Sequence, residues 1–280
     1  MNKNYKVQTL LLLVCHVVLA AIILLPLAFA LASSFRRLED VFKYMSPISW
    51  KTFVPMEPTW QAYANLFVER GFGRVVFNTF FTSIVEMIGA LLIGSLAAFA
   101  FAFYNFRCKH ALFVLVLVAF MIPFEVTAIP LYRLVDALGM IDSYSGIIVP
   151  GLANALVVFL YRQFFLDLPP ALFEAARIDG AGTLRMYAQI IMPLCRPVTV
   201  SAALMVFVHQ WESFMWPLIA VRSRQYAVIQ VALNDFTTEM GTYWNELFAA
   251  VIISMIVPIL LLVPLQRYFV KSVSSSGIKG

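Results

Sequence analysis

Three carboxylates stand inside long apolar stretches of the sequence, at Glu86, Glu125 and Glu212. A charged side chain that faced lipid would cost about 3 kcal/mol, so we expect each glutamate to face a helix bundle or a water-filled cavity. A carboxylate in such a cavity can accept hydrogen bonds from a hydroxyl-bearing solute, whereas one inside a bundle can hold two helices together. For Glu86, and for His209, we favour contacts between helices.

Glu212 belongs to a polar and aromatic group with helical spacing. His209, Glu212, Ser213 and Trp216 follow one another at i, i+3, i+4 and i+7, which would place them on one face of a continuous helix. One interpretation is a patch on a translocation path, shared with Glu125, along which a hydroxyl-bearing solute passes. The other is interhelical hydrogen bonding or a contact with a second membrane subunit. The two interpretations weigh equally for Glu212.

The sequence holds none of the familiar catalytic patterns. It lacks the G-x-x-x-x-G-K-[ST] phosphate loop, the H-E-x-x-H zinc pattern and the G-x-S-x-G nucleophile turn. Its three cysteines, Cys15, Cys108 and Cys195, have no metal-binding spacing. We therefore expect no catalytic residue, no metal and no cofactor bound by this chain, and we favour a conduit driven by a partner over an enzyme.

The most distinctive polar stretch is residues 167–197, which read DLPPALFEAARIDGAGTLRMYAQIIMPLCRP. Asp167 and the Pro169-Pro170 pair are typical of a helix start, so we predict a short helix over residues 171–178. Gly180 can take the left-handed conformation that ends a helix. We expect the whole stretch to lie at the membrane surface, hinged at this glycine.

A second short helix should follow, capped by Thr183 and stopped by Pro193 and Pro197. The first helix has a small apolar face that fits a groove in another protein. Its members are Ala171, Ala175 and Ile178. Glu174 and Arg177 could make charged contacts at the rim of that groove.

The composition identifies the class of protein. The chain of 280 residues is 62% hydrophobic and 12% charged, which leaves too few charges to cover a soluble domain. We predict an all-α integral membrane protein, a single domain with six transmembrane helices. The predicted spans are residues 10–32, 75–103, 111–132, 143–161, 198–220 and 247–266. The third contains Pro123 and Pro130, so we expect it to be kinked or broken.

The charges predict the orientation in the membrane. Six spans place both termini and residues 167–197 on one side, and that side carries 11 of the 20 Lys and Arg residues. The positive-inside rule therefore places it in the cytoplasm. The predicted external segments contain no cysteine, which agrees. We read the net charge of +5 as a topology signal, with membrane lipid as the partner and no nucleic acid.

Residues 167–197 resemble the EAA motif of permease subunits of binding-protein-dependent ABC importers. The loop residues that carry or accompany the motif are Glu174, Ala175, Ala176, Arg177, Asp179, Gly180 and Ala181, with Pro193 beyond them. Residues 211–218, WESFMWPL, are similar to the W-N-E-F-L-W-P-L element of carbohydrate-uptake permeases. Residues 277–280 are similar to the G-x-K-G end of the shorter, six-span subunit of maltose-transporter-like systems.

The resemblance implies a permease subunit that moves a sugar or related polyol across the bacterial cytoplasmic membrane by alternating access. The 167–197 loop would be the coupling helix seated in a separate ATPase, and the tail residues Ser276, Gly277 and Lys279 would reach the ATPase interface. The implied partners are a second homologous permease, two ABC ATPase subunits that hold ATP and Mg, and an extracytoplasmic solute-binding protein. Alternatives are an importer of a glycerol phosphate ester or acidic oligosaccharide, a structural or receptor membrane subunit, and a membrane enzyme.

Overall fold

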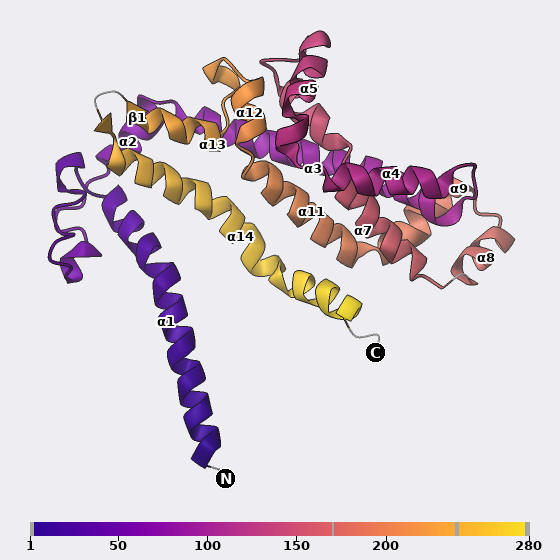
Figure 1. Ribbon diagram of the computed structural model, residues 1–280, viewed down its shortest axis with the longest axis horizontal. Helices are drawn as coiled ribbons and strands as arrows, with labels where there is room; N and C mark the ends of the chain where they lie inside the picture. The colour runs from indigo at the N-terminus through magenta and orange to yellow at the C-terminus, as the bar shows by residue number, and fades with distance from the viewer. Residues whose placement is uncertain (1–2, 170, 239–240, 278–280) are drawn as a thin grey trace. The chain divides into compact units, whose positions relative to one another are not determined.

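The computed structural model describes residues 3–169, 171–238 and 241–277 (Figure 1). The elements of the described chain are helices, apart from two paired strands of two residues each, as the predicted all-α class requires. It divides into two compact units. Unit 1 is Met1–Gly73 with Ala232–Val257, and unit 2 is Arg74–Val231 with Pro258–Gly280.

Unit 1 contains the long helix α1 (Lys3–Ser34) and the first half of α14 (Trp244–Gly277). Its other elements are short: η1 (Leu38–Asp40), η2 (Trp50–Thr52), α2 (Gln61–Val68), η6 (Leu233–Phe236), β1 (Thr237–Thr238) and β2 (Gly241–Thr242). The most apolar window of α1 has no residue buried inside the described structure. Lipid or another protein must therefore cover it.

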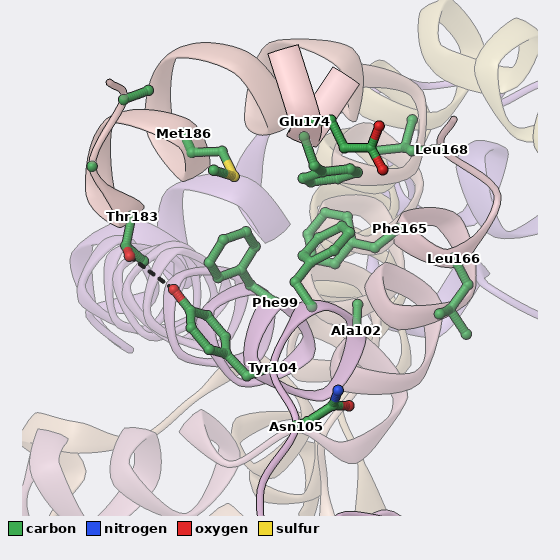
Figure 2. Close-up of a pocket in the computed structure, with 14 residues that line it drawn as sticks. Phe99, Ala102, Tyr104, Asn105, Phe165, Leu166, Leu168, Glu174, Thr183 and Met186 are labelled. Carbon is green, nitrogen blue, oxygen red and sulfur yellow. Dashed lines mark hydrogen bonds between the residues drawn. The ribbon is translucent and has the colours of Figure 1, made fainter. Parts of the chain in front are cut away.

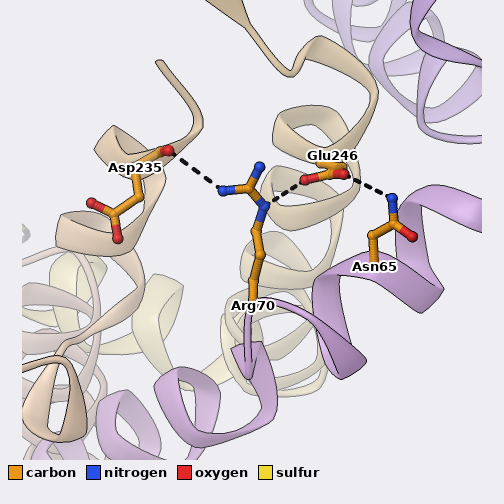
Figure 3. Close-up of polar contacts among 4 residues, drawn as sticks. All are labelled: Asn65, Arg70, Asp235 and Glu246. Atoms are coloured by element: carbon orange, nitrogen blue, oxygen red, sulfur yellow. Dashed lines mark hydrogen bonds and ion pairs between the residues drawn. The ribbon is translucent and has the colours of Figure 1, made fainter. Parts of the chain in front are cut away.

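A polar cluster ties the end of α2 to the first turn of α14 (Figure 3). The Arg70 guanidinium donates to one carboxylate oxygen of Glu246 at 2.5 Å, and Asn65 Nδ2 donates to the other at 3.0 Å. The same guanidinium stacks 4.7 Å from the ring centroid of Phe236. Because Glu246 is buried, this pair compensates a charge that would otherwise be costly inside the unit.

Unit 2 contains most of α3 (Phe72–Phe103) and the elements that follow it. These are α4 (Lys109–Met121), α5 (Phe124–Ala137), α6 (Tyr144–Ile148), η3 (Val149–Leu152), α7 (Ala155–Leu166), α8 (Ala171–Ile178), α9 (Thr183–Arg185), the π-helix η4 (Met186–Ile191), α10 (Met192–Leu194), α11 (Arg196–Trp211), α12 (Met215–Ala220), η5 (Arg224–Tyr226) and α13 (Ile229–Ala232). The core lies where α3 meets α7. A Cβ on Gly94 would overlap Val157, so this glycine lets the two helices approach closely.

Four helical stretches of the described chain are long and apolar enough to cross a membrane. They are Gln8–Ser34, Phe72–Phe103, Tyr144–Leu166 and Trp244–Leu265. Two further pairs qualify if each bent pair counts as one span: α4 with α5, bent by 104°, and Thr183–Leu194 with α11, bent by 82°. The total is then up to six. The bounds of the six membrane spans expected from the sequence stay predictions.

The breaks between these helices follow the prolines. Pro123 is the N-cap of α5 and separates it from α4, so the expected break of the third span is present, while Pro130 is accommodated inside α5. Residues 198–220 do not form one helix, contrary to our expectation, because α11 ends at Trp211 and α12 begins at Met215. Pro217 has no N–H to donate to the carbonyl four residues earlier, so a continuous helix is disfavoured there.

Candidate functional site

Helix α8 has the bounds predicted from the sequence, Ala171–Ile178. Gly180 ends it with a φ of +72°, in the left-handed region expected for this position. The Ala181 N–H then reaches back to the Ala176 carbonyl at 2.9 Å, which completes a glycine-dependent helix cap. The backbone of the loop is therefore fixed by local chemistry.

The second helical segment differs from the prediction. Gly182, rather than Thr183, occupies the N-cap of α9, and no side chain caps it. The Thr183 hydroxyl instead lies 2.8 Å from the Tyr104 hydroxyl, just beyond the end of α3. The segment continues through a π-helix and stops at Leu194, one residue after Pro193. Thr183 thus serves a tertiary contact that a local capping rule could not foresee.

One side of α8 packs on α3 within unit 2, and the other side is exposed. The ring of Phe173 contacts that of Phe103 at 4.0 Å between centroids, with the two planes tilted by 39°, and Ala176 is buried. The expected docking face is exposed, with Ala171 and Ala175 open and Ile178 86% exposed. A partner protein that covered this face would remove the isoleucine side chain from water. The side chain of Arg177 lies outside the described part of the structure.

A pocket of about 620 Å³ separates this loop from the end of α3 (Figure 2). Its lining comes from the last turns of α3 and α7 and from the loop: Phe99, Ala102, Phe103, Tyr104, Asn105, Phe165, Leu166, Leu168, Phe173, Glu174, Ala181, Gly182, Thr183 and Met186. The aromatic side chains form its floor, and the Glu174 carboxylate lies at its edge (Figure 2). The loop therefore rests on an aromatic cradle that its side chains do not fill completely.

The candidate path residues do not form the single helix face expected from their spacing. Glu212 is the exposed C-cap residue of α11, and Ser213 lies in the break that follows. Trp216 is buried in α12, where its indole N–H donates to the Gly146 carbonyl at 3.0 Å. Glu125 is exposed in the first turn of α5. The helix break separates these side chains, and their role in a path stays a prediction.

Glu86 is buried in α3, in agreement with the contact between helices that we favoured. Its carboxylate lies against Gly151 of η3, where a Cβ would overlap it. The glycine therefore makes room for a carboxylate between two elements of unit 2.

The sequence reasoning missed two polar anchors in unit 2. Asn78 donates to the carbonyls of Gln225 and Ala227, each at 2.9 Å, and accepts the Tyr144 hydroxyl at 2.7 Å. It joins three segments far apart in the sequence. An asparagine inside an apolar stretch is the one signal that could have revealed it, because such a side chain needs partners there.

The second anchor is Asp142, in the turn between α5 and α6. Its carboxylate accepts the Ser223 N–H and Oγ–H, each at 2.8 Å, and the Arg222 N–H at 3.0 Å. These hydrogen bonds, led by that of the Ser223 N–H, hold the pKa of the Asp142 carboxyl below its usual value because they favour its charged form. Asp142 also has a φ of +59°, a conformation that Asp and Asn tolerate better than most residues.

The predicted ATPase-contacting tail is described only in part. Ser276 and Gly277 belong to the last turn of α14 by their backbone, and Lys279 lies outside the described residues. Among the described residues, no cluster of three or more His, Cys, Asp or Glu side chains could hold a metal ion.

Comparison with protein families identifies the region that contains the loop. Residues 90–275 match the model of the binding-protein-dependent transport system inner membrane component. The chain is 31% identical over 275 residues to the sn-glycerol-3-phosphate transport system permease protein UgpE of Yersinia enterocolitica, covering 94% of this chain and 95% of that protein. It is 30% identical over 280 residues to the arabinooligosaccharides transport system permease protein AraQ of Halalkalibacterium halodurans, and this match covers 100% of this chain and 99% of that protein.

A solved structure has a similar fold. The crystal structure of a bacterial ABC transporter involved in the import of the acidic polysaccharide alginate includes a chain that superposes with a TM-score of 0.81. The match covers 96% of this chain and 99% of that one, at 21% sequence identity.

Proposed function

The chain belongs to the family of binding-protein-dependent transport system inner membrane components, and from this premise we propose that loop 167–197 couples it to a separate ATPase. It is a multi-pass permease subunit of an ABC importer for sugar-related solutes. No catalytic role is expected of such a subunit, and ATP and Mg²⁺ would be held by partner chains. The assignment of ATP binding to partner chains agrees with the lack of a phosphate-loop sequence in this chain.

The observation that carries the proposal is the exposed face of α8 on a glycine-capped loop. Ile178 and its neighbours offer a small apolar surface that fits a groove in the ATPase, and Glu174 would lie at the rim. When two ATPase subunits close on nucleotide, a loop seated in that groove would move with them. The aromatic cradle beneath α8 would carry the displacement to α3 and α7.

The proposed cycle is alternating access. Closure of two ATPase subunits would draw together the loops of this chain and of a second homologous permease, and open the path toward a docked solute-binding protein. The tail around Ser276, Gly277 and Lys279 would add a contact to the ATPase. Both termini would lie in the cytoplasm, in accord with the excess of basic residues assigned to that side.

For the solute we propose a sugar, as mono- or oligosaccharide, or a related polyol. Exposed polar groups such as Glu212 suit hydroxyl groups, and Glu125 would share the path. A glycerol phosphate ester is the second candidate, favoured by the similarity to UgpE permeases, and an acidic oligosaccharide belongs to the same alternative. A charged solute would need basic partners, which the second permease subunit or the binding protein would then supply.

The proposal is tested by co-purification of the tagged chain from its native membrane. We expect an ATPase with a phosphate-loop sequence and a second permease to come with it, and an extracytoplasmic binding protein after mild cross-linking. The binding protein is then screened by calorimetry against sugars, polyols and glycerol phosphate esters. Isolation of the folded chain with no ATPase, under conditions that retain other membrane complexes, would contradict the coupling role and favour a structural or receptor subunit.

A further inference from the structure

The segment between α1 and α2 has a polar centre of buried Arg36 and Thr52, next to the buried Val41, and several large apolar side chains outside it. Arg36 is 3% exposed, and its guanidinium donates to the carbonyls of Lys51 at 2.6 Å and Thr52 at 2.9 Å. The Thr52 hydroxyl in turn donates to the Tyr44 carbonyl at 2.5 Å. A buried cation that binds main-chain oxygens fixes the path of this segment. The backbone of residues 44–56 is therefore held in place without an apolar core of its own.

The large apolar side chains of residues 44–56 point away from this polar centre. Ile48 is 74% exposed and Trp50 is 63% exposed. Three more large apolar residues of the loop are also exposed: Met45, Val54 and Met56. Five large apolar side chains exposed to water in one short loop are unfavourable. A firmly held loop with this inverted arrangement is built to be covered by something outside the chain.

The position of the loop relative to α1 indicates what covers it. Phe42, just before the loop, stacks on Phe29 of α1 at 6.4 Å between ring centroids and contacts Trp244 of α14 at 5.3 Å. Phe29 precedes the last residue of α1, Ser34, by about 7.5 Å along the helix axis. The chain therefore turns back along the apolar helix after leaving it, and Figure 1 shows this indigo segment beside the upper turns of α1. Residues 44–56 are thus brought to the level at which α1 leaves the bilayer.

We propose that residues 44–56 are an interfacial anchor that lies in the headgroup and upper acyl region of the phospholipid bilayer, with Ile48 and Trp50 inserted. Tryptophan prefers this layer because its ring is apolar and its N–H is polar. The exposed Lys51 beside it can extend its ammonium group toward lipid phosphates. Bound in this way, the loop would fix the depth at which α1 emerges. The inference requires a membrane-embedded chain and does not depend on the solute or on the coupling loop.

The test places an environment-sensitive fluorophore on single cysteines in the full-length chain, in the complex in which it purifies. The three native cysteines are first replaced by serine, and the label is attached at Ile48→Cys or Trp50→Cys. Glu39→Cys, exposed in η1 of the same segment, is the matched control. The protein is reconstituted into phospholipid nanodiscs with a nitroxide quencher either near the headgroup or near the end of the acyl chain.

We expect blue-shifted emission at positions 48 and 50, and quenching by the headgroup-proximal nitroxide roughly severalfold stronger than at the control, because interfacial groups lie ~5–10 Å into this boundary. Water-like emission without quenching at both positions would overturn the proposal. Blue-shifted emission that no lipid nitroxide quenches would overturn it too, because a protein partner would then cover the loop. Neither result concerns transport, so the assignment of the chain as a permease subunit is tested independently of this experiment.

Discussion

Gly180→Val is the substitution that separates the coupling loop from the rest of the fold most cleanly. Gly180 has a φ of +72°, and nothing lies within 4 Å of the position that a Cβ would take. A new side chain therefore meets no clash, and its whole cost is the left-handed backbone, about 1–2 kcal/mol for a non-glycine residue and more for a β-branched one. A cost of that size reduces the ratio of capped to uncapped loop by a factor of roughly 5–30.

The same loop offers a matched control. Gly182 also has nothing within 4 Å of its Cβ position, but its φ is −67°, which any residue accepts. Gly182→Ala should therefore leave the loop intact, Gly180→Ala should lower coupling, and Gly180→Val should abolish it. The spans should fold in all three variants, because Gly180 and Gly182 lie outside the core, with nothing within 4 Å of their Cβ positions, and the loop side chains that pack on α3 and α7 are unchanged.

The assay measures ATP hydrolysis and solute uptake in the reconstituted complex, with pull-down of the ATPase beside it. For Gly180→Val we expect normal membrane expression, weakened ATPase capture or hydrolysis without uptake, and no transport. Normal uptake by Gly180→Val at normal expression would refute the reasoning, because the strained loop would then be irrelevant to transport. A loss of expression equal in Gly180→Val and Gly182→Ala would show that the loop matters for folding.

Three further perturbations test other parts of the structure. Glu174→Lys reverses an exposed charge at the proposed rim, so uptake should fall by no more than about fivefold; an unchanged rate and ATPase affinity would remove Glu174 from the interface. If Glu212 lines the path, Glu212→Gln should change the apparent solute affinity or the transport rate. If Glu212 is an assembly contact, the substitution should impair co-purification of the second permease. No change in either assay would exclude both roles for Glu212. Asp142 has a lowered pKa, so its stabilising hydrogen bonds are fully present above the unfolded pKa of about 3.9 and are lost as the pH falls through the lower folded value. Asp142→Asn, which tolerates the same φ, should flatten that acid loss in thermal unfolding measurements, and an identical pH profile would contradict the assignment.

Features set by local chemistry could be predicted from the sequence. The limits of α8 follow from adjacent prolines and a glycine, and the break before α5 follows from Pro123. The apolar runs likewise predict membrane helices, because the composition and length of a single segment show whether it can span the bilayer. The resemblance of residues 167–197 to a known motif was also visible because the motif lies within one continuous segment of the sequence.

Features that depend on distant partners could not be predicted. Thr183 contacts Tyr104 instead of capping a helix, and the polar centre around Arg36 forms only once residues 44–56 fold back. The prediction that Glu212 and Trp216 share one helix face was wrong, because it assumed a continuous helix where Pro217 disfavours one. Periodicity predicts which residues share a face only while the helix is continuous.

The most direct test of the central claim is solute uptake by proteoliposomes that contain the chain with its co-purified subunits and binding protein. The matched control carries an ATPase whose phosphate-loop lysine is replaced by alanine. We predict uptake only with ATP and the intact ATPase, and no ATP hydrolysis by the isolated chain. Uptake that persists with the inactive ATPase, or hydrolysis by the isolated chain, would contradict a permease driven through its coupling loop.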